Sequence, residues 1–333
     1  MKNAPRPPLL WLRFDNEVRA CPACDSTRIE LLDVFKVPRD RRGRRLTFLT
    51  GCHDCGLLFV NPLPRLDELE RQYAPEGAWA ETRKVRARRP PQAPPARDSR
   101  DVVLDALAAH VPVYAPPRGA RVLDFGCGPG KFLDRLQDAG WETYGIEPST
   151  TAAFERHVQL ERPPQDGSFD LVLLNHVLEH VTNPLEILRH LSQSLREGGV
   201  LFVGVPAVDT LPQHRDFKYC VDGRHHLLCY SQACLRGLLA RAGLAPTACL
   251  EGPELDAVTK GQPLRLRLVA TRGSASQAAP SSPLIPAVNA LAQYHSARGF
   301  ADRVRSTLPI RMRGALLDRV VERRARERRH AAS

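Results

Sequence analysis

The fold of this chain is decided by the stretch Arg121-Val122-Leu123-Asp124-Phe125-Gly126-Cys127-Gly128-Pro129-Gly130. A short apolar strand ends in an acid and three alternate glycines, and a helical pattern runs from Lys131 to Ala139. This order builds a cradle for a nucleotide-type ligand, because glycine lets a ligand approach the backbone and a helix N-terminus exposes N–H groups. The G-x-G-x-G spacing differs from the G-x-G-x-x-G of most dinucleotide sites.

Strands and helices alternate from residue 121 onward, which predicts an α/β fold with a mainly parallel, doubly wound sheet. We expect strands at 121–125, 142–147, 170–174, 199–205, 246–250 and 264–271, and helices at 131–139, 184–196 and 231–242. The pair Gly198-Gly199 is expected to end a helix and begin the next strand. Asp98 or Ser99 is expected to cap a helix that continues to His110.

The composition excludes some classes of protein. The formal net charge is +11, which would suit an anionic partner. Only six of the 48 basic residues are lysine, and such arginine, alanine and proline richness is typical of a GC-rich genome, so we expect no nucleic-acid partner. No apolar stretch reaches the roughly 18 residues of a membrane span, and residues 1–11 do not form a secretory signal. These features predict a cytoplasmic protein.

Two C-x-x-C pairs near the N-terminus predict a metal site. The pairs are Cys21-Pro22-Ala23-Cys24 and Cys52-His53-Asp54-Cys55, with 27 residues between them. Four thiolates can surround a tetrahedral zinc ion, and this donor set leaves no open position, so the predicted metal is structural. The alternatives are ordinary thiols or a redox pair, and His53 is an alternative ligand.

The chain divides into four predicted parts. Residues 1–75 hold the cysteine pairs, and 76–97 form a linker rich in proline and arginine. Residues 98–272 form the α/β domain, and 273–333 a linker and a basic helical tail with eleven arginines and four acids in its last 50 residues. That tail could contact a membrane or a protein partner, although a solvated or docked helix is the favoured interpretation. The oligomeric state stays open.

The acid followed by glycines at 124–130 resembles the first motif of class I S-adenosylmethionine (SAM) dependent methyltransferases. The run from Cys55 to Pro64, with Leu69 and Tyr73, resembles the N-terminal zinc ribbon of a subset of these bacterial enzymes, including the zinc-binding sugar C-methyltransferases. The resemblance implies a Rossmann-like domain, SAM as cofactor, structural zinc and a small-molecule acceptor methylated at carbon or oxygen. An RNA methyltransferase, whose binding to polyanions would be salt-sensitive, and a non-catalytic binding protein are the alternatives.

The resemblance also implies the cofactor-binding residues. They are Asp124, Gly126, Cys127, Gly128, Gly130, Glu147, Asn175 and His176. Glu147 closes the second strand, where an acid can accept both ribose hydroxyls. One departure is that Asp170 lies only 23 positions after Glu147, which leaves room only for a short helix at 150–157 and a strand at 158–160. The adenine contact is therefore unassigned.

The candidate catalytic residues are His226 and His225. His226 aligns with a histidine of the resembled enzymes, and His225 stands where the sugar C-methyltransferases carry an acid. Methyl transfer from a sulfonium needs alignment and a base for the acceptor's proton, a role that neutral histidine suits. A packing or capping role for His226 is the alternative. We expect Ser231 to cap the helix that follows and His180 to be structural.

Overall fold

The computed structural model describes residues 20–35, 39–40, 43–44, 47–74, 97–148, 156–208, 225–257 and 265–273. The predicted 76–97 linker, apart from Arg97, lies outside the described residues. So do most of the predicted 150–157 helix and the basic tail from residue 274 onward. These predictions stay untested.

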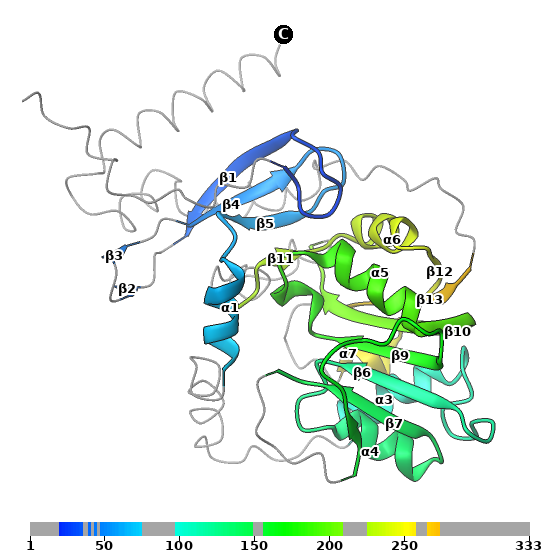
Figure 1. The fold of residues 1–333 in the computed structure, drawn as a ribbon. Helices are drawn as coiled ribbons and strands as arrows, with labels where there is room; N and C mark the ends of the chain where they lie inside the picture. The colour runs from blue at the N-terminus through cyan, green and yellow to red at the C-terminus, as the bar shows by residue number, and fades with distance from the viewer. Residues whose placement is uncertain are drawn as a thin grey trace, which may run out of the picture.

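The centre of the molecule is a seven-stranded sheet with the order β12-β13-β10-β9-β6-β7-β8 (Figure 1). Its strands are β6 (Arg121–Phe125), β7 (Glu142–Ile146), β8 (Val158–Gln159), β9 (Phe169–Asn175), β10 (Leu195–Pro206), β12 (Leu244–Cys249) and β13 (Arg265–Arg272). Neighbours from β10 to β8 pair in parallel, and β13 is antiparallel to both β10 and β12. The predicted mainly parallel, doubly wound sheet is confirmed. The chain order reverses between β6 and β9, which is where such sheets bind ligands.

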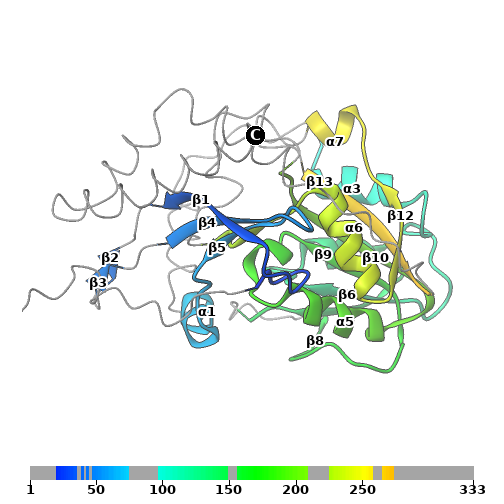
Figure 2. The same ribbon diagram turned by 90° about the horizontal axis from the view of Figure 1, so that it is seen from above.

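Helices cover both faces of this sheet (Figures 1 and 2). They are α3 (Ser99–Leu107), α4 (Lys131–Asp138), α5 (Pro184–Ser194), α6 (Gln232–Arg241) and α7 (Pro253–Ala257). Apolar residues of α3, α4 and α7 share one buried cluster, and those of α5 and α6 belong to a second. In α5, Leu185, Leu188 and Leu191 recur at helical spacing and are buried, so the apolar face of α5 packs against the sheet.

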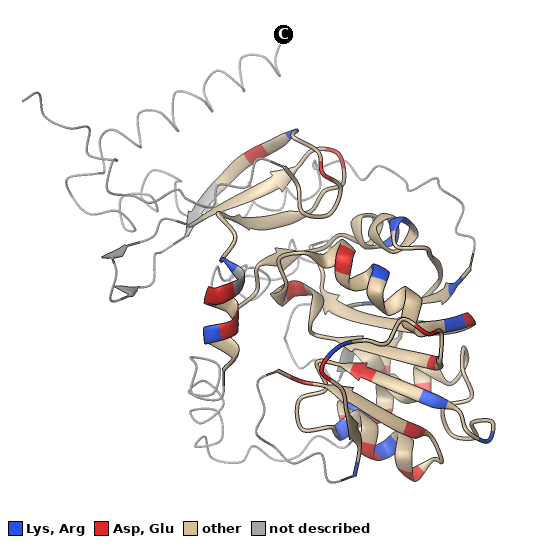
Figure 3. Cartoon of the chain, viewed as in Figure 1, with Lys and Arg blue, Asp and Glu red and all other residues tan. Residues whose placement is uncertain are grey.

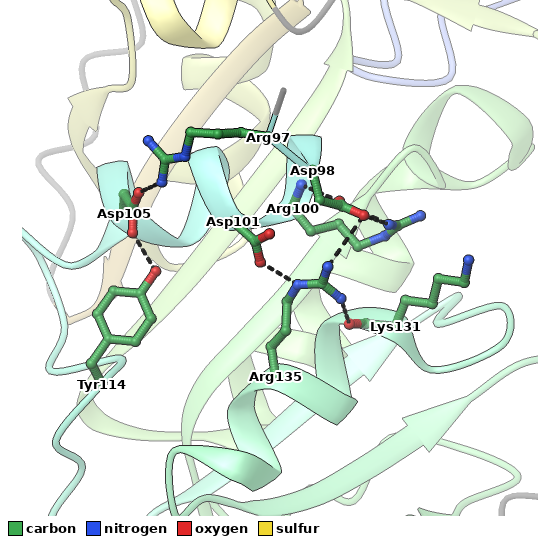
Figure 4. Close-up of polar contacts among 8 residues, drawn as sticks. All are labelled: Arg97, Asp98, Arg100, Asp101, Asp105, Tyr114, Lys131 and Arg135. Carbon is green, nitrogen blue, oxygen red and sulfur yellow. Dashed lines mark hydrogen bonds and ion pairs between the residues drawn. The ribbon is translucent and has the colours of Figure 1, made fainter. Parts of the chain in front are cut away.

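Polar contacts fix the start of α3 on α4 (Figure 4). Asp98 is the N-cap, and its carboxylate accepts a hydrogen bond from the Arg100 backbone N–H at 2.9 Å. Arg135 of α4 forms ion pairs with Asp98, at 3.2 Å, and with Asp101, and it donates to the Lys131 carbonyl oxygen at 2.9 Å. These groups are partly exposed, so the contacts chiefly set geometry. These contacts fix the position of α4, which begins directly after the glycine-rich stretch at 126–130.

The prediction for Gly198-Gly199 is wrong. Helix α5 ends at Ser194, and β10 begins at once with Leu195. The β9–β10 register jumps from Leu195↔Phe169 to Val200↔Leu171, so residues 196–199 bulge opposite a single residue. Gly198 has φ of +69°, and a Cβ on Gly199 would lie 3.0 Å from the Phe169 carbonyl oxygen. The glycines therefore serve a bulge inside the strand.

The N-terminal residues form a second sheet with the order β1-β4-β5-β11. Its strands are β1 (Ile29–Phe35), β4 (Thr47–Cys52), β5 (Leu58–Asn61) and β11 (Leu228–Cys229), with a small hairpin of β2 (Arg39–Asp40) and β3 (Gly43–Arg44) and then helix α1 (Leu66–Tyr73). Strand β11 comes from the C-terminal half of the chain. Leu58 and Phe59 belong to the same buried cluster as Leu174 and Tyr230. This N-terminal sheet, which we call the ribbon, and the α/β domain thus share a strand and a core.

Charged residues of both signs are interspersed along the described helices (Figure 3). The acidic residues of α1, for example, stand beside Arg71. The longest described α-helix, α5, has 11 residues, and within the described ranges no helix has the length and apolar character to cross a membrane.

Candidate functional site

The turn after β6 is shaped by three glycines with positive φ. Gly126, Gly128 and Gly130 have φ of +79°, +55° and +75°, a region that L side chains rarely adopt. A Cβ on Gly126 would lie 2.3 Å from Cγ2 of Val177, so this position is closed. A Cβ on Gly128 would have no atom of the described residues within 4 Å. The glycine turn, residues 126–130, is therefore open at Gly128.

Two acids flank the glycine turn. Asp124 belongs to β6 and is only 3% exposed, and Glu147 directly follows β7. Oε2 of Glu147 accepts a hydrogen bond from the Gly128 backbone N–H at 2.8 Å. Burial, with the nearby charge of Glu147, raises the pKa of Asp124 to about 7. A buried carboxylate of this kind is stabilised by a cation, so the site favours a ligand with a positive group.

Cys127 supports the glycine turn through its backbone N–H, while its side chain is buried. The residue is 8% exposed and belongs to the apolar cluster of α3 and α4. Burial raises the pKa of its thiol. Its N–H donates to the Ile146 carbonyl oxygen at 3.2 Å, which ties the turn to the end of β7.

The sheet continues beyond β7 with the two-residue strand β8, and contacts of His157 fix this edge. Strand β8 pairs in parallel with β7, with Tyr144 opposite Val158. The ring of His157 lies 2.8 Å from Thr143 Oγ1 and 3.1 Å from Asp134 Oδ1, which joins the edge to β7 and α4. The adenine-side contact stays unassigned, because residues 149–155 lie outside the described part.

Asn175 and His176 stand at the carboxyl end of β9. A Cβ on Gly204 would lie 2.4 Å from Asn175 Oδ1, so the amide fits only because its neighbour in β10 is glycine. His176 has φ of +58° and donates its backbone N–H to the Gly204 carbonyl oxygen at 2.8 Å. Its Nδ1 lies 2.8 Å from Oε1 of Glu179. The imidazole ring of His176 therefore contacts the turn that follows β9.

That turn, η1 (Leu178–His180), brings three candidate residues together. One ligand atom each of Glu179, His180 and His226 lies within 4.8 Å of the others, and we call these residues the Glu179 cluster. His180 Nε2 is 3.8 Å from Glu179 Oε1, and the two histidine rings meet edge to face with centroids 4.9 Å apart. Burial would raise the pKa of Glu179, but His180, His176 and His226 lower it to about 2. The carboxylate is ionised at neutral pH.

The sequence leaves the acid partner of His226 unidentified, and the structure places Glu179 beside it. His180, expected to be structural, lies in the same cluster. The adjacent Glu179-His180 pair, three residues after His176, is the sequence signal that could have indicated it.

His225 lies beside the Glu179 cluster and links it to the ribbon. Its backbone carbonyl oxygen accepts a hydrogen bond from His180 Nδ1 at 2.7 Å. Its own Nδ1 lies 3.0 Å from Nε2 of Gln72 in α1. Tyr73, also in α1, meets the His180 ring edge to face at 6.3 Å between centroids. The N-terminal unit thus reaches the candidate catalytic residues.

The four cysteines of the C-x-x-C pairs converge in the ribbon. All four Sγ atoms lie within 4.8 Å of one another, with Cys21 and Cys55 at 3.5 Å and Cys24 and Cys52 at 3.6 Å. Tetrahedral sulfurs at 2.3 Å from zinc are about 3.8 Å apart, so the donor set and its spacing fit zinc. The Ala23 N–H also points at Cys21 Sγ, at 3.5 Å.

His53 is not part of this cysteine group. Its Nε2 lies 3.1 Å from Oε2 of Glu30, and its side chain is 41% exposed. The alternative in which His53 is a metal ligand is therefore wrong.

The open α/β sheet, with a glycine turn at the point where its strand order reverses, defines a nucleotide-type cofactor-binding domain. Residues 96–248 match the family model described as a methyltransferase domain. This part of the chain is therefore similar to methyltransferase domains.

Curated relatives are similar to that part. Malonyl-[acyl-carrier protein] O-methyltransferase of Enterobacter lignolyticus is 32% identical over 133 residues, which are 37% of this chain and 52% of the relative. Ubiquinone biosynthesis O-methyltransferase of Xanthomonas campestris is 36% identical over 118 residues, 31% of this chain and 48% of the relative. The chain thus spans about half the length of these curated relatives.

Among solved structures, 1,6-didemethyltoxoflavin-N1-methyltransferase of Burkholderia thailandensis is similar with a TM-score of 0.45 at 17% identity. The similarity covers 72% of this chain and 99% of that one.

Proposed function

We propose that this chain transfers the methyl group of SAM to a small-molecule acceptor. The observation that carries the proposal is a glycine turn that is open at Gly128 and flanked by Asp124 and Glu147. It lies in the part of the chain that matches a methyltransferase domain.

Two glycines of the turn and the two acids that flank it have proposed tasks toward the cofactor. Asp124 would pair with the cofactor's ammonium group, which relieves the cost of its buried charge. Glu147 would accept hydrogen bonds from the ribose hydroxyls, and Gly126 and Gly128 would let the aminoacyl half approach the backbone. SAM, when bound, supplies an electrophilic methyl group on a sulfonium.

The Glu179 cluster is the proposed acceptor side. It begins two residues beyond Val177, whose side chain covers Gly126, so it adjoins the glycine turn. If no metal ion is bound at the Glu179 cluster, His226 would take the acceptor's proton, and Glu179 would stabilise the imidazolium. Both curated relatives above are named as O-methyltransferases, which favours an oxygen acceptor over the carbon acceptor of the sugar C-methyltransferases.

We propose that Cys21, Cys24, Cys52 and Cys55 hold a structural zinc ion. The ion would stabilise the ribbon whose helix α1 contributes Gln72 and Tyr73 to the acceptor side.

The proposed acceptor class is tested with methyl-tritiated SAM. The full chain is incubated with a panel of hydroxyl-bearing small molecules, among them nucleotide sugars, and separately with total RNA. We expect label in at least one small molecule and loss of that label in His226→Ala. Label that enters only RNA would overturn the small-molecule proposal. Saturable SAM binding without any transfer would favour a non-catalytic binding protein.

A further inference from the structure

The carboxylate of Glu179 is fully buried, and its two oxygens differ. Oε1 lies 2.8 Å from His176 Nδ1, which donates because the carboxylate can only accept. Oε2 is also buried and has no hydrogen-bond partner among the described residues. A buried acceptor left unsatisfied costs roughly 1–3 kcal/mol. An oxygen in this position suits a ligand that the described residues do not supply.

His180 is held in one tautomer. Its Nδ1 lies 2.7 Å from the His225 carbonyl oxygen, which only accepts, so Nδ1 carries the proton. In the neutral ring Nε2 then carries a lone pair, and this atom lies on the side of Glu179, 3.8 Å from Oε1. A histidine whose other nitrogen donates to a backbone carbonyl is the usual arrangement of a metal ligand, because the outer hydrogen bond orients the ring.

His226 completes a set of three donors. Its ligand atom lies within 4.8 Å of those of Glu179 and His180. Ligands at 2.0–2.2 Å from zinc are about 3.4 Å apart, so the three donor atoms would move closer together on binding the ion, and both histidines are only partly buried. We propose that Glu179, His180 and His226 bind a divalent cation of the zinc class, with His176 as the residue that positions the carboxylate. Two imidazoles favour such a transition-metal ion over magnesium or calcium.

Three protein ligands leave a coordination position open, as in catalytic zinc sites. Resting on the proposed function, we assign that position to the acceptor's hydroxyl oxygen. The cation would lower the pKa of this hydroxyl, and its proton would pass to solvent water. The oxygen's electron pair then forms the bond to the methyl carbon, the carbon–sulfur bond breaks and the sulfur keeps its pair. With the cation bound, His226 is a ligand and does not act as the base.

The proposal is tested by titrating the full, metal-free chain with Co²⁺ and recording its visible and near-ultraviolet absorption. Thiolate ligands give an intense sulfur-to-cobalt charge-transfer band, whereas a site of two histidines and a carboxylate gives only the weaker d–d bands. We expect two binding events, one of each kind. Binding with the thiolate signature alone would overturn the proposal.

Variants locate the second binding event. His226→Gln and Glu179→Gln should each abolish it and keep the thiolate band, which also reports that the ribbon is folded. His176→Asn should weaken it by roughly 10- to 100-fold, the usual effect of losing an outer-shell partner. His110→Gln, at an exposed histidine, is the matched control and should bind like the unaltered chain. Unchanged cobalt binding by His226→Gln would refute the assignment.

The same samples are titrated with S-adenosylhomocysteine. Loss of cation binding in His226→Gln with retained cofactor binding is the expected pattern. Cation binding without any cofactor binding would keep the metal site and refute the proposed function. Cofactor binding without the second cobalt event would refute the metal site alone.

Discussion

Replacing Asp124 with asparagine should stabilise the free protein and weaken cofactor binding. Asp124 is 3% exposed, and the pKa of its carboxyl is raised from 3.8 to about 7, mainly by burial. At about 1.4 kcal/mol for each pH unit, ionising Asp124 in the folded chain lowers the free energy of unfolding by about 4 kcal/mol. Asparagine keeps the shape of the side chain without this charge.

The effect has a defined pH dependence. Between about pH 4 and pH 7 the folded chain holds the Asp124 proton more tightly than the unfolded chain, so stability falls as the pH rises. The gain in Asp124→Asn should therefore be small at pH 4 and approach about 4 kcal/mol at pH 8.

Urea unfolding at both pH values measures this gain, with Glu142→Gln, at an exposed acid at the opposite end of β7, as the control. Calorimetry at pH 8 should show an affinity for S-adenosylhomocysteine that is about 10- to 100-fold lower, because a hydrogen bond to a charged group is lost. A variant that is no more stable than the unaltered chain at pH 8, or that binds the cofactor equally well, would refute the reasoning.

Two further substitutions test the glycine turn and the ribbon. Gly128→Ala places a methyl group in open space at φ of +55°, so it should cost about 1–2 kcal/mol of stability and lower cofactor affinity in calorimetry. Gly119→Ala, at φ of +75° and away from the turn, should show the same cost without the affinity loss, and equal affinity losses would contradict the site. Cys24→Ser should remove one zinc ion per chain by elemental analysis, and it should slow methyl transfer because α1 contacts His225 and His180. Cys249→Ser, outside the cysteine group, should keep the metal, and unchanged zinc in Cys24→Ser would refute the ribbon site.

The sheet could be predicted from the sequence because its inner strands are continuous apolar runs. Strand β6 begins and ends as expected, and β9 extends one residue further at each end. The start of β10 was not predictable from Gly198-Gly199, because a glycine pair suits a helix end and a strand bulge equally. The two-residue strand β11 has no pattern of its own and forms only by pairing with β5.

The candidate site was predictable where it depends on local sequence. The glycine turn and its acids follow from the spacing of Asp124, Gly126 and Glu147. The Glu179 cluster depends on contacts between η1 and residues about 45 positions away, such as the hydrogen bond from His180 to His225. Such long-range contacts leave no periodic signal in one sequence, so Glu179 was missed.

The most direct test of the account is a calorimetric titration of the full, zinc-replete chain with S-adenosylhomocysteine. The glycine turn, open at Gly128 between Asp124 and Glu147, predicts one saturable site with micromolar-range affinity that strengthens as the pH rises through about 7. A folded protein that shows no binding at all would contradict the cofactor site, and with it the proposed methyl transfer.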